Sequence, residues 1–158
     1  MLETSIESHL LNNECSKNIF LGVFARDELP VIEEIKYPSC FVLNNQNRGA
    51  VGEHWLAIYY NENKKAFFFD SYGLNPMFYS LTKYLRETSN SWTYNQKRIQ
   101  GESQYCGYYC IFYLISICRN ETIKFFKHFS KNLGQNDQIL SDIFEKNYNN
   151  FLLELKSI

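Results

Sequence analysis

The sequence has neither an excess of one charge nor a long apolar run. Lysine plus arginine number 16 and aspartate plus glutamate 17 among 158 residues, so the chain has no overall basic field of the kind that holds nucleic acid. Small basic clusters such as Lys97-Arg98 are expected to be solvated surface. No apolar segment has the length of a membrane-spanning helix, and residues 1–5 lack the basic and apolar regions of a secretory signal. We therefore expect no membrane segment and an intracellular setting.

Internal repeats, low-complexity linkers and metal-binding cysteine pairs are also missing. The 158 residues, 45% of them apolar, suit one folded domain spanning 1–158. The five cysteines contain no Cys-x-x-Cys unit, which argues against a zinc site. Because their number is odd, we expect free thiols in a reducing compartment, with Cys110 and Cys118 as small buried side chains of a helix. A disulfide between Cys106 and Cys110 is not expected, since it would strain that helix.

One cysteine lies where a loop turns abruptly into an apolar helix. Polar, glycine-containing residues 100–105 precede Cys106, and an apolar run at 111–115 follows it. Unpaired backbone N–H groups and the positive end of the helix dipole favour a thiolate over a thiol at the first turn of a helix. Cys106 is therefore the candidate nucleophile.

A thiolate nucleophile needs an imidazole partner, and the chain has only three histidines. His9 lies in an amphipathic N-terminal stretch and His128 on an expected helix, and both are typical of surface or packing residues. His54 differs because it opens a segment with strand-type alternation, just after a glycine-containing loop. His54 is therefore the candidate general acid and base.

The strand that begins near His54 is expected to form a hairpin. A turn at 61–64 joins residues 52–60 to a second apolar run at 65–73. Because the start of one strand of a hairpin lies beside the end of the other, Asp70 becomes a neighbour of His54 although sixteen positions separate them.

Asp70 has two interpretations. It could hold the His54 imidazole in one tautomer as the third member of a catalytic triad. Taken alone, it could equally cap the turn at 71–73, with His54 an ordinary strand residue. The presence of Cys106 and Gln100 in the same chain favours the catalytic interpretation.

Glutamine supplies a candidate for the oxyanion hole, because acyl transfer through a thiolate develops negative charge on the carbonyl oxygen. Gln100, six residues before Cys106, is the preferred candidate. Gln104 is closer in sequence, but a residue two positions before a helix-capping cysteine is expected to point away from the site.

Together these segments resemble the adenovirus-type cysteine endopeptidases, or adenains, and more distantly the SUMO-specific proteases of the same clan. The matching segments are, in order, Phe20-Leu21-Gly22, Glu53-His54-Trp55, Asp70-Ser71-Tyr72-Gly73, Gln100-Gly101 and Cys106-Gly107. The order His, Asp, Gln, Cys separates this clan from papain-like enzymes, in which Gln and Cys precede His.

The chain departs from the adenain pattern at three points. The acidic residue is Asp70 where adenovirus enzymes usually carry glutamate, and the spacing from Gln100 to Cys106 is one residue shorter, as in SUMO proteases. Adenovirus enzymes are also activated by a viral peptide bonded to a cysteine between the acidic residue and the nucleophile, and use DNA as a cofactor. No cysteine lies between Cys40 and Cys106, so covalent activation is not expected. A noncovalent peptide or DNA activator stays open.

The resemblance implies a cysteine endopeptidase that cleaves virion or capsid precursor proteins of viruses, virophages or transposons at glycine-containing sites. It implies a protein substrate, no required metal or organic cofactor, and a setting in the host nucleus or cytoplasm and in the virion. Trp55 and Gly107 are expected at the substrate cleft, although Trp55 fits a core aromatic equally well. A monomer is favoured because no interface stripe is visible.

Two other functions stay open. One is a protease that removes SUMO or ubiquitin-like modifiers. The other, from a different class, is a catalytically silent binding module that keeps the fold and grips a partner through the same groove.

The expected fold is α+β, a central mixed β-sheet flanked by helices, as in adenains and SUMO proteases. Helices are expected at 3–11, 77–88, from Cys106 onwards, at 122–130 and from Asp137 to Leu155, and strands at 40–43, in the hairpin and at 93–99.

Overall fold

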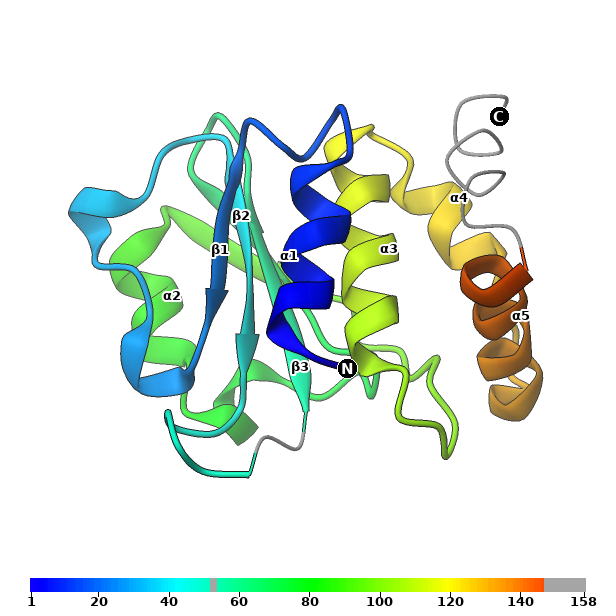
Figure 1. Cartoon of the computed structure of the whole chain (residues 1–158). Helices are drawn as coiled ribbons and strands as arrows, with labels where there is room; N and C mark the ends of the chain where they lie inside the picture. Colours follow the sequence, from blue (N-terminus) through cyan, green and yellow to red (C-terminus); the bar gives the residue numbers. More distant parts are fainter. Residues whose placement is uncertain (52–53, 147–158) are drawn as a thin grey trace.

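The computed structural model describes residues 1–51 and 54–146, which form an α+β fold around a five-stranded mixed sheet (Figure 1). The strands follow one another across the sheet in chain order: β1 (Phe20–Phe24), β2 (Ser39–Asn44), β3 (Trp55–Tyr60), β4 (Lys65–Phe69) and β5 (Ser91–Tyr94). The outer pairs β1–β2 and β4–β5 are parallel, and the inner pairs are antiparallel. The general class expected from the sequence is confirmed.

The helices cover both faces of this sheet. In chain order they are α1 (Glu3–Leu11), α2 (Thr82–Thr88), α3 (Cys106–Cys118), α4 (Thr122–Lys127) and α5 (Leu133–Lys146), with short 3-10 helices η1 (Arg26–Glu28), η2 (Ile32–Glu34) and η3 (Pro76–Tyr79). Figure 1 shows α1 and α3 on one face of the sheet and α2 on the other, with α4 and α5 outside α3.

The central strands send alternate side chains to the two faces of the sheet, as β-structure requires. On β3, Trp55 and Ala57 belong to the core on the α1 and α3 side, whereas Leu56 and Ile58 belong to the core on the α2 side. Both cores consist of buried apolar side chains, so the sheet is covered on both faces.

The helix α3 is apolar around its whole circumference. Its residues from Tyr109 to Ile117 are all buried, against β3 on one side and α1, α4 and α5 on the others. A helix of this kind must be covered on every side, which fixes its position in the molecule. Its first residue, Cys106, is thereby held beside the beginning of β3.

Several expected boundaries were wrong. The helix expected at 77–88 is divided, because Ser80 adopts a left-handed conformation with φ of 55° between η3 and α2. The strand expected at 93–99 ends at Tyr94, just before Gln96 turns to a φ of 52°. The strand β1 was not among the expected strands.

At the C-terminal side, α4 ends at Lys127 rather than at residue 130, and α5 begins at Leu133, four residues before Asp137. The expected helix positions Tyr148, Phe151, Leu152 and Leu155 lie outside the described residues.

The expectation of five free thiols was also wrong. Cys15 and Cys118 form a disulfide with a Cα–Cα distance of 6.1 Å, which joins the segment after α1 to the end of α3. Cys40, Cys106 and Cys110 are free and buried. An odd cysteine count shows that at least one thiol is unpaired, but not which distant pair the fold brings together. Across 1–51 and 54–146, no helix combines the length and the apolar character needed to cross a membrane.

Candidate active site

The hairpin of β3 and β4 brings His54 and Asp70 together, as expected. The antiparallel register pairs Ala57 with Phe69, so His54, just before β3, and Asp70, just after β4, lie at the same end of the sheet. The Nε2–H of His54 donates a hydrogen bond of 2.6 Å to Oδ1 of Asp70. His54 is 5% exposed and Asp70 is fully buried, so water competes little for this contact.

The Asp70 carboxylate also accepts three further hydrogen bonds. Oδ1 accepts from the backbone N–H of Tyr72 at 2.9 Å, and Oδ2 accepts from the backbone N–H of Leu74 at 3.1 Å and from the Tyr79 hydroxyl at 2.7 Å. A buried carboxylate is stable when its oxygens are satisfied in this way. Asp70 therefore caps the turn that follows β4 and also accepts a hydrogen bond from the His54 imidazole.

Two asparagines that the sequence interpretation missed fix the backbone of these residues. Asn45 accepts from the His54 N–H at 3.1 Å through its side chain, and its own N–H donates to the His54 carbonyl at 3.0 Å. The Asn95 side chain accepts from the Asp70 N–H at 3.0 Å and donates to the Asp70 carbonyl at 2.7 Å. Their loop positions carry no pattern that distinguishes them from the other asparagines.

Tyrosines hold the plane of the His54 ring. Tyr72 stacks on it with ring centroids 4.5 Å apart and an interplanar angle of 15°, and the Tyr79 ring is also nearly parallel to it at 6.2 Å. Arg98 in turn lies 5.1 Å from the Tyr72 ring centroid. The imidazole is thus oriented both by the Asp70 hydrogen bond and by ring packing.

His54 also interacts with Cys106. In the described part of the chain His54 Nδ1 is buried and has no conventional hydrogen-bond partner. Burial lowers the pKa of His54, but the hydrogen bond to Asp70 and the interaction with Cys106 outweigh it and raise the pKa to about 9. A protonated imidazole is therefore favoured at neutral pH.

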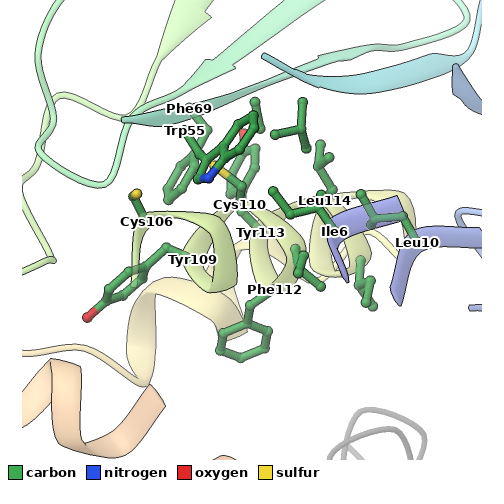
Figure 2. Close-up of a cluster of buried hydrophobic side chains, with 14 of the residues drawn as sticks. Ile6, Leu10, Trp55, Phe69, Cys106, Tyr109, Cys110, Phe112, Tyr113 and Leu114 are labelled. Atoms are coloured by element: carbon green, nitrogen blue, oxygen red, sulfur yellow. The ribbon is translucent and has the colours of Figure 1, made fainter. Parts of the chain in front are cut away.

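Cys106 lies at the first turn of α3, with Trp55 on the strand side of the helix and Tyr109 on the opposite side (Figure 2). Burial raises the pKa of its thiol, but the interaction with His54 and hydrogen bonds from the backbone of Trp55 and Gly107 lower it below the ordinary value. A thiolate and an imidazolium thus stabilise each other.

The other two free cysteines behave in the opposite way. Burial raises the pKa of Cys40 to about 12 and that of Cys110 well above its ordinary value. Figure 2 shows Cys110 inside the apolar cluster, one turn along α3 from Cys106. Cys106 is the only free thiol of the described residues whose pKa is lowered.

A cavity of about 310 Å³ opens beside Cys106. Its lining comes from the N-terminal segment, the residue after β1, the end of β2 and the loop after it, the start of β3, the loop before α3 and the first residue of α3: Met1, Leu2, Glu3, Ala25, Asn44, Gln46, Asn47, Arg48, Gly49, Ala50, Trp55, Gln104 and Cys106. Trp55, 8% exposed, is both a core residue and part of the wall of this cavity.

Gly107 is not among the residues that line this cavity, but it lies next to two that do, Met1 and Trp55. A Cβ atom there would lie 2.7 Å from the Met1 Sδ and 3.2 Å from the Trp55 Cδ1. The absent side chain lets Met1 and Trp55 pack against the first turn of α3, next to Cys106.

The two glutamines occupy different places. Gln104 lines the cavity, so the expectation that it points away from the site was wrong. Gln100 is 1% exposed, and its side chain is held at both ends. Its Oε1 accepts from the Ser71 hydroxyl at 2.5 Å, and its Nε2 donates to the Ser103 carbonyl at 2.7 Å.

The remaining histidines pack against aromatic rings. His9 lies against Tyr108 and Phe144, and His128 against Phe112. Within 1–51 and 54–146 no group of three or more His, Cys, Asp or Glu side chains is arranged to hold a metal ion.

Comparison of this sequence with models of known protein families finds no match, and comparison with curated proteins finds none either.

Proposed function

We propose that the chain is a cysteine endopeptidase with the adenain-like and SUMO-protease-like fold, and that His54, Asp70 and Cys106 form its catalytic triad. One observation carries the proposal: the His54 imidazole is hydrogen-bonded to a buried carboxylate and also interacts with Cys106, whose pKa is lowered. This is the arrangement that activates a thiol and later protonates a leaving group.

The reaction begins when the Cys106 thiolate attacks the carbonyl carbon of a peptide bond and forms a carbon–sulfur bond. The carbonyl electron pair moves to oxygen. As the carbon–nitrogen bond breaks, the His54 imidazolium gives its proton to the departing amine, and Asp70 keeps the ring in position. Neutral His54 then takes a proton from water as the oxygen of that water attacks the thioester carbon. When the carbonyl re-forms, the carbon–sulfur bond breaks, the acid product leaves, and the Cys106 thiolate and the His54 imidazolium are restored.

The Gln100 side chain is the proposed oxyanion donor. An amide NH₂ group has two hydrogens, so the contact with Ser103 uses one and leaves the other for the substrate oxygen. Gln104, which lines the cavity beside Cys106, is better placed to contact the substrate along its length.

We propose virion or capsid precursor proteins, cleaved at glycine-containing sites, as the substrates. The cavity beside Cys106 supports a peptide substrate, because Asn44, Gln46 and Asn47 can pair with the polar groups of an extended backbone.

The chemistry needs no metal or organic cofactor, and a noncovalent activating peptide or DNA fits the resemblance to adenains. We propose that the protein acts in the host nucleus or cytoplasm and in the virion. The Cys15–Cys118 bond favours the virion, since disulfides persist there.

The alternative of a silent binding module depends on Cys106 being buried and unreactive. Cys106 is 7% exposed, which meets the first half of that condition. Its lowered pKa and its position in the cavity wall oppose the second half.

The proposal is tested by covalent labelling with two probes, a Gly-Gly peptide vinyl sulfone and a probe carrying a SUMO or ubiquitin C-terminus. Wild type should react with the peptide probe, and Cys106→Ala and His54→Ala should not. Cys110→Ala is the matched control, because it removes a free thiol one turn further along α3 and should leave labelling intact.

Other outcomes change the assignment. Labelling by the modifier probe alone moves the function to deconjugation. If neither probe reacts, with or without added DNA and candidate peptides, the endopeptidase proposal fails and the binding module is favoured.

A further inference from the structure

We propose that Asn136 and Asp137 of α5 are positioning residues that hold Gln100 in place for the oxyanion. The inference rests on the proposed function and adds a second part of the chain to the site, far from the catalytic residues in sequence. Both side chains are buried, with Asn136 at 0% and Asp137 at 8% exposure.

Asn136 holds the backbone on one side of Gln100. Its Nδ2 donates to the carbonyl of Ile99 at 2.9 Å and to that of Ser130 at 2.9 Å. Its Oδ1 accepts from the Ser130 N–H at 2.9 Å. The side chain thus ties the residue before Gln100 to the loop that precedes α5.

Asp137 holds the backbone on the other side. Its carboxylate accepts from the Gly101 N–H at 3.0 and 3.1 Å, from the Ser103 N–H at 3.2 Å and from the Tyr109 hydroxyl at 2.9 Å. Tyr109 belongs to α3, one turn after Cys106. One buried carboxylate therefore links α5, the loop before the nucleophile and the helix that carries it.

We call the contacts of Asn136 and Asp137 the Gln100 clamp, and the contact of Asp137 reaches the Gln100 side chain through Ser103. Its Nε2 donates to the Ser103 carbonyl, and the N–H of the same Ser103 donates to Asp137. Movement of Ser103 away from Asp137 would move the acceptor that orients the Gln100 amide. An oxyanion donor misplaced by about 1 Å costs roughly 100-fold in rate.

The contact with Asp137 explains why the residue after Gln100 is a glycine. A Cβ atom on Gly101 would lie 2.6 Å from the Asp137 Oδ2 and 3.1 Å from the Leu133 carbonyl. Glycine lets the loop approach α5 closely enough for its N–H to reach the carboxylate.

The test compares Asp137→Asn with wild type and with Asp142→Asn. The amide keeps the size of the side chain but places an N–H group among three donors. Asp142 lies in the same helix and accepts from Gln138 at the surface, so its substitution makes the same charge change elsewhere. Tyr109→Phe is a milder variant that removes one donor to Asp137 and keeps the ring.

Three readouts separate a positioning role from a general structural one. The first is kcat and KM on a cleaved peptide, the second the affinity for a peptide aldehyde, and the third the rate of Cys106 alkylation by chloroacetamide. The aldehyde forms a tetrahedral adduct that needs the oxyanion hole, and alkylation does not.

For Asp137→Asn we expect kcat and aldehyde affinity to fall together by about 10- to 100-fold, with KM and alkylation changed less than about twofold. Tyr109→Phe should show the same pattern with a smaller factor, and Asp142→Asn should match wild type. Equal loss in all three readouts, or no loss in kcat and aldehyde affinity for either variant, overturns the proposal.

Amide hydrogen exchange keeps the inference separate from the proposed function. The N–H groups of Gly101 and Ser103 should exchange slowly in wild type and about 10-fold or more faster in Asp137→Asn. If wild type cleaves nothing, the endopeptidase proposal fails, while this loss of protection still supports the clamp. Unchanged protection overturns the clamp whether or not the protein is an enzyme.

Discussion

The His54 imidazole is hydrogen-bonded to Asp70 through Nε2 and also interacts with Cys106. Its pKa, raised to about 9, lies above the ordinary value of 6.5, while the pKa of the Cys106 thiol is lowered. Between these two pKa values the site holds a thiolate and an imidazolium together.

The pH dependence follows from these directions. Hydrolysis is expected to fall as the pH rises through about 9, because His54 loses the proton that the leaving amine needs. Alkylation of Cys106 should persist above that pH, because the thiolate remains. Rates of both reactions measured on one protein across the pH range check this, and parallel curves would contradict it.

The same shift affects stability. The pKa of His54 is higher in the folded state than in the unfolded state. The stabilisation that its protonated form gives to the folded state is therefore complete below about pH 6.5 and is lost as the pH rises through about 9. Thermal unfolding of wild type and His54→Ala at pH 6 and pH 9.5 measures it. The melting temperature of wild type should exceed that of His54→Ala by more at pH 6 than at pH 9.5.

Removing the Tyr79 hydroxyl should weaken the Asp70 network. Tyr79→Phe takes away the 2.7 Å hydrogen bond to Oδ2, and loss of a hydrogen bond to a buried charged group costs about 1.5–3 kcal/mol. Urea unfolding of this variant checks the free energy, with Tyr94→Phe as the control on β5. A loss below about 0.5 kcal/mol would show that Asp70 is satisfied without Tyr79.

At the scale of single residues, the sequence predicted the site residues that lie at the boundaries of helices and strands. His54 precedes β3, Asp70 follows β4 and Cys106 opens α3, so periodicity and turn signals pointed to all three. Asn45 and Asn95 could not be predicted, because each is a loop asparagine whose partner is fixed only when the chain folds.

At the scale of elements, the hairpin and α3 were predictable because their patterns are strong and continuous. The helix expected at 77–88 was not correctly predicted, since one left-handed residue, Ser80, interrupts a helical pattern without a glycine or proline at that position. The role of α5 was also missed, because amphipathic spacing indicates packing but not which buried polar groups it carries.

The helix α2 should contribute stability but no chemistry. Leu85 is fully buried in the core on its side of the sheet, so Leu85→Ala should cost about 2–5 kcal/mol. Lys83→Ala, an exposed change on the same helix, should be near neutral. Chemical unfolding measures both, and labelling of Cys106 at low temperature should be unchanged in each. Loss of labelling in folded Leu85→Ala would show that α2 shapes the site.

At the scale of the whole molecule, the Cys15–Cys118 disulfide joins residues 103 positions apart. Cross-linking so long a loop stabilises by about 2–5 kcal/mol, chiefly through the unfolded chain. Reduction with a phosphine should therefore lower the melting temperature of wild type by roughly 5–15 °C. Cys15→Ser should melt at the lower temperature and show no further response to the reductant. Equal melting temperatures with and without reductant would contradict the prediction.

The same disulfide closes residues 15–118 into a covalent ring, with one segment before it, residues 1–14, and a tail after it. His54, Asp70, Gln100 and Cys106 all lie within the ring from residue 15 to residue 118, whereas Asn136 and Asp137 lie in the tail. A single cut inside the ring, by the protein itself or by another protease, leaves two pieces that stay bonded and run as one band on a non-reducing gel. A cut between α3 and α5 frees the fragment that carries the Gln100 clamp. Damage by proteolysis therefore has unequal consequences along the chain. One cut can detach part of the site only outside the ring, either before residue 15, where Met1, Leu2 and Glu3 line the cavity, or in the tail.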